Sequence, residues 1–223
     1  MTLTPIAHIR SEFPTKFGIP RQSGVVPELS AAIVFEPEYR VQDALRGLEG
    51  FSHLWLIWGF SGVAQTTWSP TVRPPRLGGN TRLGVFATRT PYRPNPLGLS
   101  AVEIEAVAVE AERGPVIHVR GADLMDGTPI YDIKPYLPYA DCIPTATGGF
   151  AAEGAGETLV VEDPKGFLAR LPEQQRGALA AVLAQDPRPG YIRDPERVHG
   201  FLFAGFEVRF QVVEDVLVII EIV

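Results

Sequence analysis

The stretch GLSAVEIEAVAVEAERGPVIHVRGA, residues 98–122, decides the fold because it contains two strand-like runs joined by a turn signal. In the first run, apolar side chains alternate with acidic ones, which is the period of a strand with one buried face. The phase of the alternation slips near Ala106. The tripeptide Arg113-Gly114-Pro115 marks the turn into the second run, residues 116–122.

Further short runs precede this pair and cover residues 5–10, 30–35, 51–60 and 82–88. The run at 51–60, FSHLWLIWGF, is apolar and aromatic enough to predict a strand that is buried on both faces. Six or seven short strands separated by turn signals favour a closed antiparallel barrel over alternating strands and helices. The one helix expected in this half covers residues 38–48, whose apolar face is formed by Tyr39, Val41, Ala44, Leu45 and Leu48.

The chain changes character near residue 140. Residues 140–156 are rich in Gly, Ala and Thr and predict a linker. After it we expect a strand at 157–161, a helix from Pro172 to the stop at Asp186-Pro187, and strands at 201–213 and 216–223. The sequence therefore predicts a mainly β chain, α+β overall: a barrel domain at 1–140, a linker at 141–156 and a small α+β domain at 157–223.

Composition excludes several classes of protein. A single cysteine allows no internal disulfide, and four scattered histidines give no reason to expect a metal site. No signal-peptide pattern is visible at the N-terminus, and every apolar run is far shorter than the roughly 20 residues of a membrane span, so we expect neither a leader nor a span. No dinucleotide-binding or P-loop glycine motif is present. We expect a soluble, cytoplasmic protein.

The segment PTVRPPRLGGNTRLGVFATRTPYRPNPLGLS, residues 70–100, contains five arginines and no acid. The chain as a whole has 20 basic and 26 acidic residues, so an anion must be bound locally. Guanidinium groups between rigid turns predict a site for an anionic or planar partner. A role in holding a dimer or domain boundary together remains the alternative. The five arginines are Arg73, Arg76, Arg82, Arg89 and Arg93.

Two other stretches contain side chains suited to chemistry. Residues 123–138, DLMDGTPIYDIKPYLP, bring acids, a base and a phenol together, which suits a site where an amine or hydroxyl is oriented and loses a proton. A turn capped by aspartates, with ordinary loop charges, is the alternative. In residues 185–191, QDPRPGY, two prolines fix a loop whose Arg188 and Tyr191 could hold a phosphate and stack on a base.

Six motifs carry a resemblance to a known family: PRQSG (20–24), GLEGFSHLW (47–55), TVRPPRLGGN (71–80), GVFATRTPYRPNPLGLS (84–100), DLMDGTPIYDIKPYLP (123–138) and LAQDPRPGY (183–191). They resemble, in order, the tRNA adenine methyltransferases that modify threonylcarbamoyladenosine at position 37 of the anticodon loop. The resemblance implies an S-adenosylmethionine-dependent enzyme with a β-barrel, acting as a homodimer with the donor pocket near the subunit boundary.

The resemblance also implies roles for individual residues. The donor pocket would be lined by Pro20, Arg21, Gln22, Ser61, Gly62, Arg89, Leu99, Asp123, Leu124, Met125 and Asp126. From the chemistry of such a methyl transfer, rather than from the motifs, we expect Asp126 to take the amine proton and Lys134 and Tyr136 to orient the base or its carboxylate. The tRNA would be contacted by Arg73, Arg76, Arg93, Asn95, Arg188 and Tyr191.

Two alternatives stay open from the residues alone. A non-catalytic RNA-binding barrel would use the same arginines and aromatics but would need no enclosed donor pocket. A small-molecule hydrolase or lyase would use Asp123, Asp126 and Lys134, although the sequence has no G-x-S-x-G elbow and no metal-ligand motif.

Overall fold

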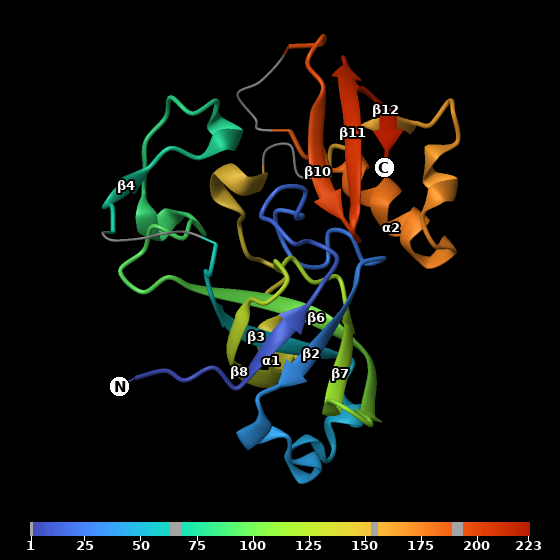
Figure 1. Ribbon diagram of the computed structural model, residues 1–223. Coiled ribbons are helices and arrows are strands. Elements are labelled where there is room, and N and C mark those ends of the chain that lie inside the picture. Colours follow the sequence, from blue (N-terminus) through green and yellow to red (C-terminus); the bar gives the residue numbers. More distant parts are fainter. Residues whose placement is uncertain (1, 63–67, 153–155, 189–193) are drawn as a thin grey trace.

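A computed structural model describes residues 2–62, 68–152, 156–188 and 194–223 (Figure 1). Six antiparallel strands close into a barrel in the order β1-β2-β7-β6-β3-β8. Pairing of β8 with β1 completes the ring. The strands are β1 (Ala7–Arg10), β2 (Ser30–Phe35), β3 (His53–Gly59), β6 (Leu97–Glu110), β7 (Gly114–Arg120) and β8 (Pro129–Pro135).

The hairpin of β6 and β7 confirms the pattern read from residues 98–122. The register between the two strands shifts between Ile104 and Ala106, where the alternation in the sequence slips. A shift of this kind inserts one extra residue into one strand and reverses which side chains face inward. The phase slip was therefore the sequence signal of a bulge.

The barrel interior is filled by alternating side chains from all six strands. On β3, Leu54 and Leu56 are fully buried and Trp58 is nearly so, whereas Trp55 and Ile57 between them are partly exposed. The expectation that this strand is buried on both faces is therefore wrong for the single chain. Its outward aromatic and aliphatic side chains lie on the outer surface of the barrel.

A second sheet lies beside the barrel, with the strand order β10-β11-β12-β9 and helix α2 packed against it (Figure 1). Its elements are β9 (Val160–Glu162), α2 (Glu173–Ala184), β10 (His199–Phe203), β11 (Phe206–Val213) and β12 (Val216–Ile222). The single strand expected at 201–213 is divided by a turn, because Ala204 and Gly205 both have positive φ angles, of 52° and 85°. Four side chains of α2 are buried against the sheet: Ala178, Leu179, Val182 and Leu183.

The segment that connects β1 to β2, residues 11–29, packs against the second sheet. The Phe13 ring meets Phe203 edge to face, with 5.4 Å between the centroids. The backbone oxygen of Glu12 accepts a hydrogen bond from the Ala204 amide at 2.9 Å, and its carboxylate accepts one from Gln175 at 2.8 Å. This segment, here called the connecting loop, therefore belongs to the hydrophobic core of the C-terminal sheet although it lies between two barrel strands.

Two expected elements are wrong. The helix expected at 38–48 is replaced by three short 3₁₀ turns, η1 (Pro37–Tyr39), η2 (Gln42–Leu45) and η3 (Leu48–Gly50). Gly47 adopts φ 88°, which ends any helix at that point, and only Leu45 in these turns is buried. The strand expected at 82–88 is reduced to the two-residue β5 (Leu83–Gly84), followed by the 3₁₀ turn η5 (Val85–Ala87).

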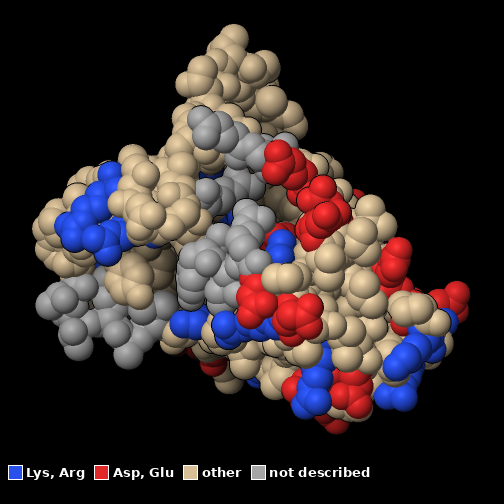
Figure 2. All heavy atoms as spheres, turned by 90° about the horizontal axis from the view of Figure 1, so that it is seen from above, with Lys and Arg blue, Asp and Glu red and all other residues tan. Residues whose placement is uncertain are grey.

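Residues 68–96 form a projection from the barrel that we call the arginine lobe (Figure 1). Its short strands β4 (Thr71–Val72) and β5 pair with each other, and the 3₁₀ turn η4 (Pro75–Leu77) lies between them. Figure 2 shows Arg side chains on this lobe, whose sequence contains no Lys, Asp or Glu.

The remaining described elements are short: α1 (Pro138–Asp141), η6 (Gly149–Ala152) and η7 (Phe167–Arg170). None of the helices in the described ranges is both long and apolar enough to cross a membrane.

Candidate functional site

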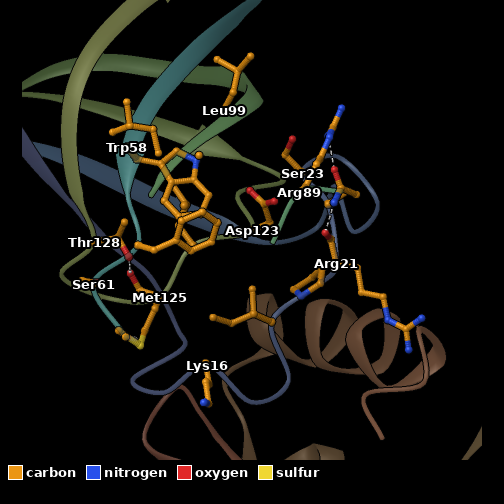
Figure 3. A pocket seen from close by; sticks show the side chains of 18 of the residues that line it. Lys16, Arg21, Ser23, Trp58, Ser61, Arg89, Leu99, Asp123, Met125 and Thr128 are labelled. Atoms are coloured by element: carbon orange, nitrogen blue, oxygen red, sulfur yellow. Dashed lines mark hydrogen bonds between the residues drawn. The ribbon is translucent and has the colours of Figure 1, made fainter. Parts of the chain in front are cut away.

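Five segments of the chain, drawn from both ends of the barrel sequence and from between them, surround a cavity of about 660 Å³ (Figure 3). They are residues 16–23 of the connecting loop, 55–62 at the end of β3, 88–93 of the arginine lobe, 97–101 at the start of β6, and 123–128 after β7. Pockets of about 300–1,000 Å³ are typical of small-molecule and cofactor sites. The site lies where the barrel, the lobe and the connecting loop meet.

Ten of the eleven residues expected to bind the donor line this cavity. They are Pro20, Arg21, Gln22, Ser61, Gly62, Arg89, Leu99, Asp123, Leu124 and Met125. The connecting loop and the lobe are joined here, because Arg89 donates a hydrogen bond to the side chain of Gln22. Gln22 in turn donates to the backbone oxygen of Arg21 at 2.5 Å.

Positively charged side chains outnumber negatively charged ones among the described residues that line the cavity. Among the described residues that line it, Asp123 is the only acid, while Lys16, Arg21, Arg89 and Arg93 are cationic. In Figure 3 Asp123 lies between Trp58 and Arg89. The walls can therefore pair with both a carboxylate and a positive charge on one ligand, and the rings of Trp55, Trp58 and Phe60 supply apolar surface.

Asp123 is held by a chain of hydrogen bonds from the barrel. Ser100 Oγ lies 2.6 Å from Asp123 Oδ1, and Trp58 Nε1 donates to Ser100 Oγ at 3.0 Å. Burial raises the pKa of the Asp123 carboxyl above its ordinary value, although the hydrogen bonds from Ser100 and from the Ser23 backbone and the charge of Arg89 act in the opposite direction.

Asp126, expected both to bind the donor and to accept a proton, is not brought to the cavity. Its carboxylate accepts a hydrogen bond from the Ser11 amide at 3.1 Å and lies 3.5 Å from Arg10 Nη1. Its own amide donates to the Phe13 oxygen at 2.8 Å. The backbone turns at Gly127, where φ is 76°, so the side chain of Asp126 leaves the wall that Asp123 to Met125 form.

Lys134 and Tyr136 also lie outside the residues that line the cavity. Lys134 is largely exposed and pairs with Asp132 at 3.1 Å. The Tyr136 ring packs beside Trp55, which lines the cavity, with 5.5 Å between the centroids. The expected group of Asp126, Lys134 and Tyr136 is therefore not assembled in this chain.

The residues expected to contact tRNA are divided between two places. Arg73 and Asn95 are exposed on the arginine lobe, and Arg93 lies at its base, where it donates to the Thr88 oxygen at 2.5 Å and lines the cavity. The backbone of Arg76 lies in η4. The large apolar side chains exposed on the lobe are aromatic: Trp68, Phe86 and Tyr92.

Arg188 differs from the expectation that its loop presents it to a partner. Its side chain is only 6% exposed and makes two hydrogen bonds to Asp186, at 2.7 and 2.9 Å. Burial works against ionisation of Asp186, but the hydrogen bonds and charge of Arg188 outweigh it and lower the pKa of Asp186. A smaller cavity of about 330 Å³ lies between this loop and residues 16–21. Tyr191 lies outside the described residues.

Sequence reasoning missed several residues that line the cavity or hydrogen-bond to a residue that does. Trp58 was recognised only as part of a buried strand, and Ser100 only as the end of a motif. The signal for Trp58 was present in Gly98, because a Cβ atom added there would lie 2.2 Å from Trp58 Cε2. The indole thus lies directly on the backbone of the neighbouring strand. The other missed residues include Lys16, Ile19, Ser23, Phe60, Thr88 and Thr128.

No three His, Cys, Asp or Glu side chains gather closely enough to hold a metal ion within the part of the chain that the structure describes.

Comparison with known proteins covers nearly the whole chain. The family model described as the tRNA-methyltransferase O N-terminal domain matches residues 8–142, and that of the TrmO C-terminal domain matches residues 163–223. The chain is 41% identical over 218 residues to the tRNA (adenine(37)-N6)-methyltransferase of Escherichia coli (strain K12), which covers 94% of this chain and 92% of that protein.

Two further matches come from Pseudomonas aeruginosa. The putative S-adenosylmethionine-dependent methyltransferase RcsF is 40% identical over 216 residues, which is 94% of this chain and 91% of that protein. A crystal structure of TrmO superposes with a TM-score of 0.79 at 32% identity, over 100% of this chain and 98% of that one. The chain therefore belongs to the tRNA-methyltransferase O family.

Proposed function

We propose that this protein is a tRNA adenine-N6-methyltransferase that uses S-adenosylmethionine and methylates the exocyclic amine of threonylcarbamoyladenosine at position 37 of the anticodon loop. Family membership over both parts of the chain and the names of its relatives support the activity. The observation that carries the proposal is the convergence of ten expected donor residues, from five separate segments, on one cavity.

The cavity suits this donor in size and in charge. Bound S-adenosylmethionine supplies a methyl group on a sulfonium sulfur, ready for displacement. Arg21 and Arg89 would pair with its carboxylate, Asp123 would face its positive charge, and the indole of Trp58 would contact its apolar surface. Each of these groups belongs to the cavity wall, so the chain presents the three kinds of contact that such a ligand needs.

The work of the site is alignment. The nitrogen must be held in line with the methyl carbon and the sulfur, so that the N–C bond forms as the C–S bond breaks and the amine proton passes to water. Holding reactants in this geometry accounts for much of the rate acceleration in such transfers. We assign no general base to Asp126, Lys134 or Tyr136, because none of them lines the cavity.

The arginine lobe is the proposed contact for the anticodon loop. It combines exposed arginines with exposed aromatic rings and has no acidic residue. Single-stranded nucleic acids are bound by this combination, in which cations follow the backbone and rings stack on bases. Arg73, Arg93 and Asn95 would contact the RNA, whereas the buried Arg188 would hold Asp186.

We also propose the larger organisation of the enzyme. It has a barrel domain at 1–140, a linker at 141–156 and a C-terminal domain at 157–223. It acts as a homodimer whose boundary lies near the cavity, which the exposure of Leu99 at the cavity rim supports. It acts in the cytoplasm, in accord with its tRNA substrate and its lone cysteine.

Mass spectrometry of tRNA nucleosides tests reaction, donor and substrate together. Purified protein is incubated with a methyl-labelled donor and with tRNA that carries or lacks the threonylcarbamoyl group. Label on threonylcarbamoyladenosine at position 37 is the expected result, and absence of labelled nucleoside from both tRNAs contradicts the proposal. The alternative of a non-catalytic RNA-binding barrel is separated by calorimetry, since only the enzyme needs to bind S-adenosylmethionine in the absence of RNA.

A further inference from the structure

The hydrogen bonds among Trp58, Ser100 and Asp123 run in one direction. An indole N–H can only donate, so Ser100 Oγ must accept from Trp58. The hydroxyl has one proton of its own, which is then directed at Asp123 Oδ1, 2.6 Å away. Because a hydrogen bond donated to a carboxylate favours its charged form, the chain stabilises ionised Asp123 against the effect of burial.

The barrel register builds this arrangement. Trp58 on β3 pairs with Gly98 on β6, two residues before Ser100. A Cβ atom at position 98 would lie 2.2 Å from the indole, so only glycine lets the ring lie across β6 toward Ser100. Ser100 itself is 1% exposed, so its hydroxyl depends on partners within the protein. The geometry is thus fixed by two neighbouring strands of the closed barrel.

Among the described residues that line the cavity, no second carboxylate competes with Asp123. The other charged groups that line the cavity are Lys16 and Arg21 from the connecting loop and Arg89 and Arg93 from the arginine lobe, all cationic, and the charge of Arg89 acts on the Asp123 carboxyl. Among the described lining residues, Asp123 is therefore the one place where a positive charge of a ligand finds a negative partner. Its orientation would decide whether a cationic ligand is accepted.

We propose that Trp58 and Ser100 are positioning residues that keep Asp123 ionised and fixed in the cavity wall, where its carboxylate receives the positive charge of the methyl donor. This inference rests on the proposed function for the identity of the donor. It assigns a role to Trp58 and Ser100, which would affect donor binding only through their hold on Asp123.

The first test uses the ligand-free protein, so it does not depend on the proposed function. The Asp123 carboxyl is titrated by carbon-detected NMR. Ser100→Ala removes a donor to the carboxylate and should raise the pKa of Asp123 by about one pH unit. Trp58→Phe should raise it by less, because Ser100 remains but is no longer held. An unchanged Asp123 titration in Ser100→Ala overturns the proposal.

Trp55→Phe is the matched control for the indole. Trp55 lies on the same strand and donates from Nε1 to a different carboxylate, Asp141, at 3.0 Å. Its substitution should leave the Asp123 titration where it is in the wild type. Trp58→Phe keeps a large aromatic ring in place, so it tests the chain independently if Ser100→Ala does not fold.

The second test measures the affinity for S-adenosylmethionine against pH by calorimetry. Affinity should fall on the acid side as Asp123 is protonated, and in Ser100→Ala this fall should begin about one pH unit higher, in step with the NMR titration. In Asp123→Asn the acid-side fall should vanish and affinity should be low throughout. A Ser100→Ala protein whose affinity is lowered equally at every pH overturns the positioning role.

Discussion

At the scale of the residue, Asp126 acts as a tether between two walls of the cavity. Ser11 donates its amide to Asp126 and its hydroxyl to the Leu124 oxygen, at 3.1 and 2.8 Å. Asp126→Ala leaves the Ser11 amide without its acceptor and should lower the free energy of unfolding by about 1 kcal/mol, measured by urea denaturation. Asp43→Ala is the control, because Asp43 pairs only with exposed Arg46 and should change little.

The tether and the base predict different outcomes for Asp126. If it only ties the walls together, catalysis at saturating donor and tRNA should survive in Asp126→Ala once the protein is folded. A loss of turnover of about a hundredfold or more, with stability unchanged, would show that Asp126 takes part in the chemical step as a base.

Asp123 predicts a trade between stability and binding. Its pKa in the folded chain is raised above the ordinary 3.8, so protonation stabilises the fold below that value and this stabilisation is lost as the pH rises through the raised pKa. At neutral pH the buried charge therefore weakens the fold. Asp123→Asn should raise the free energy of unfolding at pH 7 while it lowers donor affinity. Urea denaturation at pH 7 and at acid pH checks the direction of this stability change. The difference in the free energy of unfolding between Asp123→Asn and the wild type should shrink as the pH falls.

The residue scale also shows where prediction from sequence stops. Asp123, Leu124 and Met125 were predicted correctly to lie together because they are consecutive. The motif does not indicate that the Asp126 side chain points away from the cavity, because its direction depends on the turn at Gly127 and on the hydrogen bond from Ser11. Trp58 and Ser100 are 42 positions apart in the sequence, and only the strand register brings them together.

At the scale of the element, the connecting loop is held from one side and forms the cavity wall on the other. Gly18 and Gly24 both have positive φ angles, of 82° and 75°. A Cβ atom at Gly18 would lie 2.4 Å from the Phe201 ring, whereas at Gly24 it would meet nothing within 4 Å. Substitution by Ala strains both backbones alike, so the difference between the two variants isolates the contact with the C-terminal sheet.

Gly18→Ala should therefore lower the free energy of unfolding by about 1–3 kcal/mol more than Gly24→Ala. It should also weaken donor binding, because residues 19–23 of the displaced loop line the cavity. Thermal unfolding and calorimetry measure the two effects. Equal destabilisation by both substitutions would show that the loop does not depend on its contact with Phe201.

The arginine lobe makes a separate electrostatic prediction. Arg73 and Arg82 are exposed, and no ion pair among the described residues includes them. If both contact phosphates, the double substitution Arg73→Gln with Arg82→Gln should reduce the slope of log affinity for tRNA against log salt by about 1.4. Arg113→Gln, in the turn between β6 and β7, removes a charge outside the lobe and should leave the slope unchanged.

Elements outside the barrel strands were the least predictable. The barrel strands have period-two patterns and clear turn signals, and these gave the hairpin of β6 and β7 with its bulge. Residues 38–48 have a helical pattern, but they form three separate turns, with Gly47 at a positive φ of 88° between the second and the third. Residues 82–88 contain side chains that favour strands, yet only Leu83 and Gly84 pair with another strand. The strand preference of individual residues does not determine whether a partner strand lies beside them.

At the scale of the whole molecule, the two hydrophobic cores are linked through the connecting loop. Phe13, Val26 and Leu29 come from the N-terminal part of the sequence, but they are buried with α2 and the C-terminal sheet. The domain boundary expected from the sequence, near residue 157, therefore does not separate the two hydrophobic cores, because part of the connecting loop belongs to the C-terminal one. Because the same loop lines the cavity, the C-terminal sheet supports the site without lining it.

This packing predicts that the C-terminal sheet and the barrel unfold together. All three tryptophans, Trp55, Trp58 and Trp68, lie in the N-terminal part, so their fluorescence reports that part alone. Phe203→Leu, in β10, should destabilise the protein by about 1 kcal/mol. Because Phe203 packs on Phe13, the tryptophan transition in urea should move to lower concentration together with the circular dichroism transition. Val160→Ala, on the 60% exposed Val160 of β9, should move neither. A tryptophan transition that stays in place while the circular dichroism divides into two steps would mean that the barrel stands without the sheet, and that the loop needs no support from it.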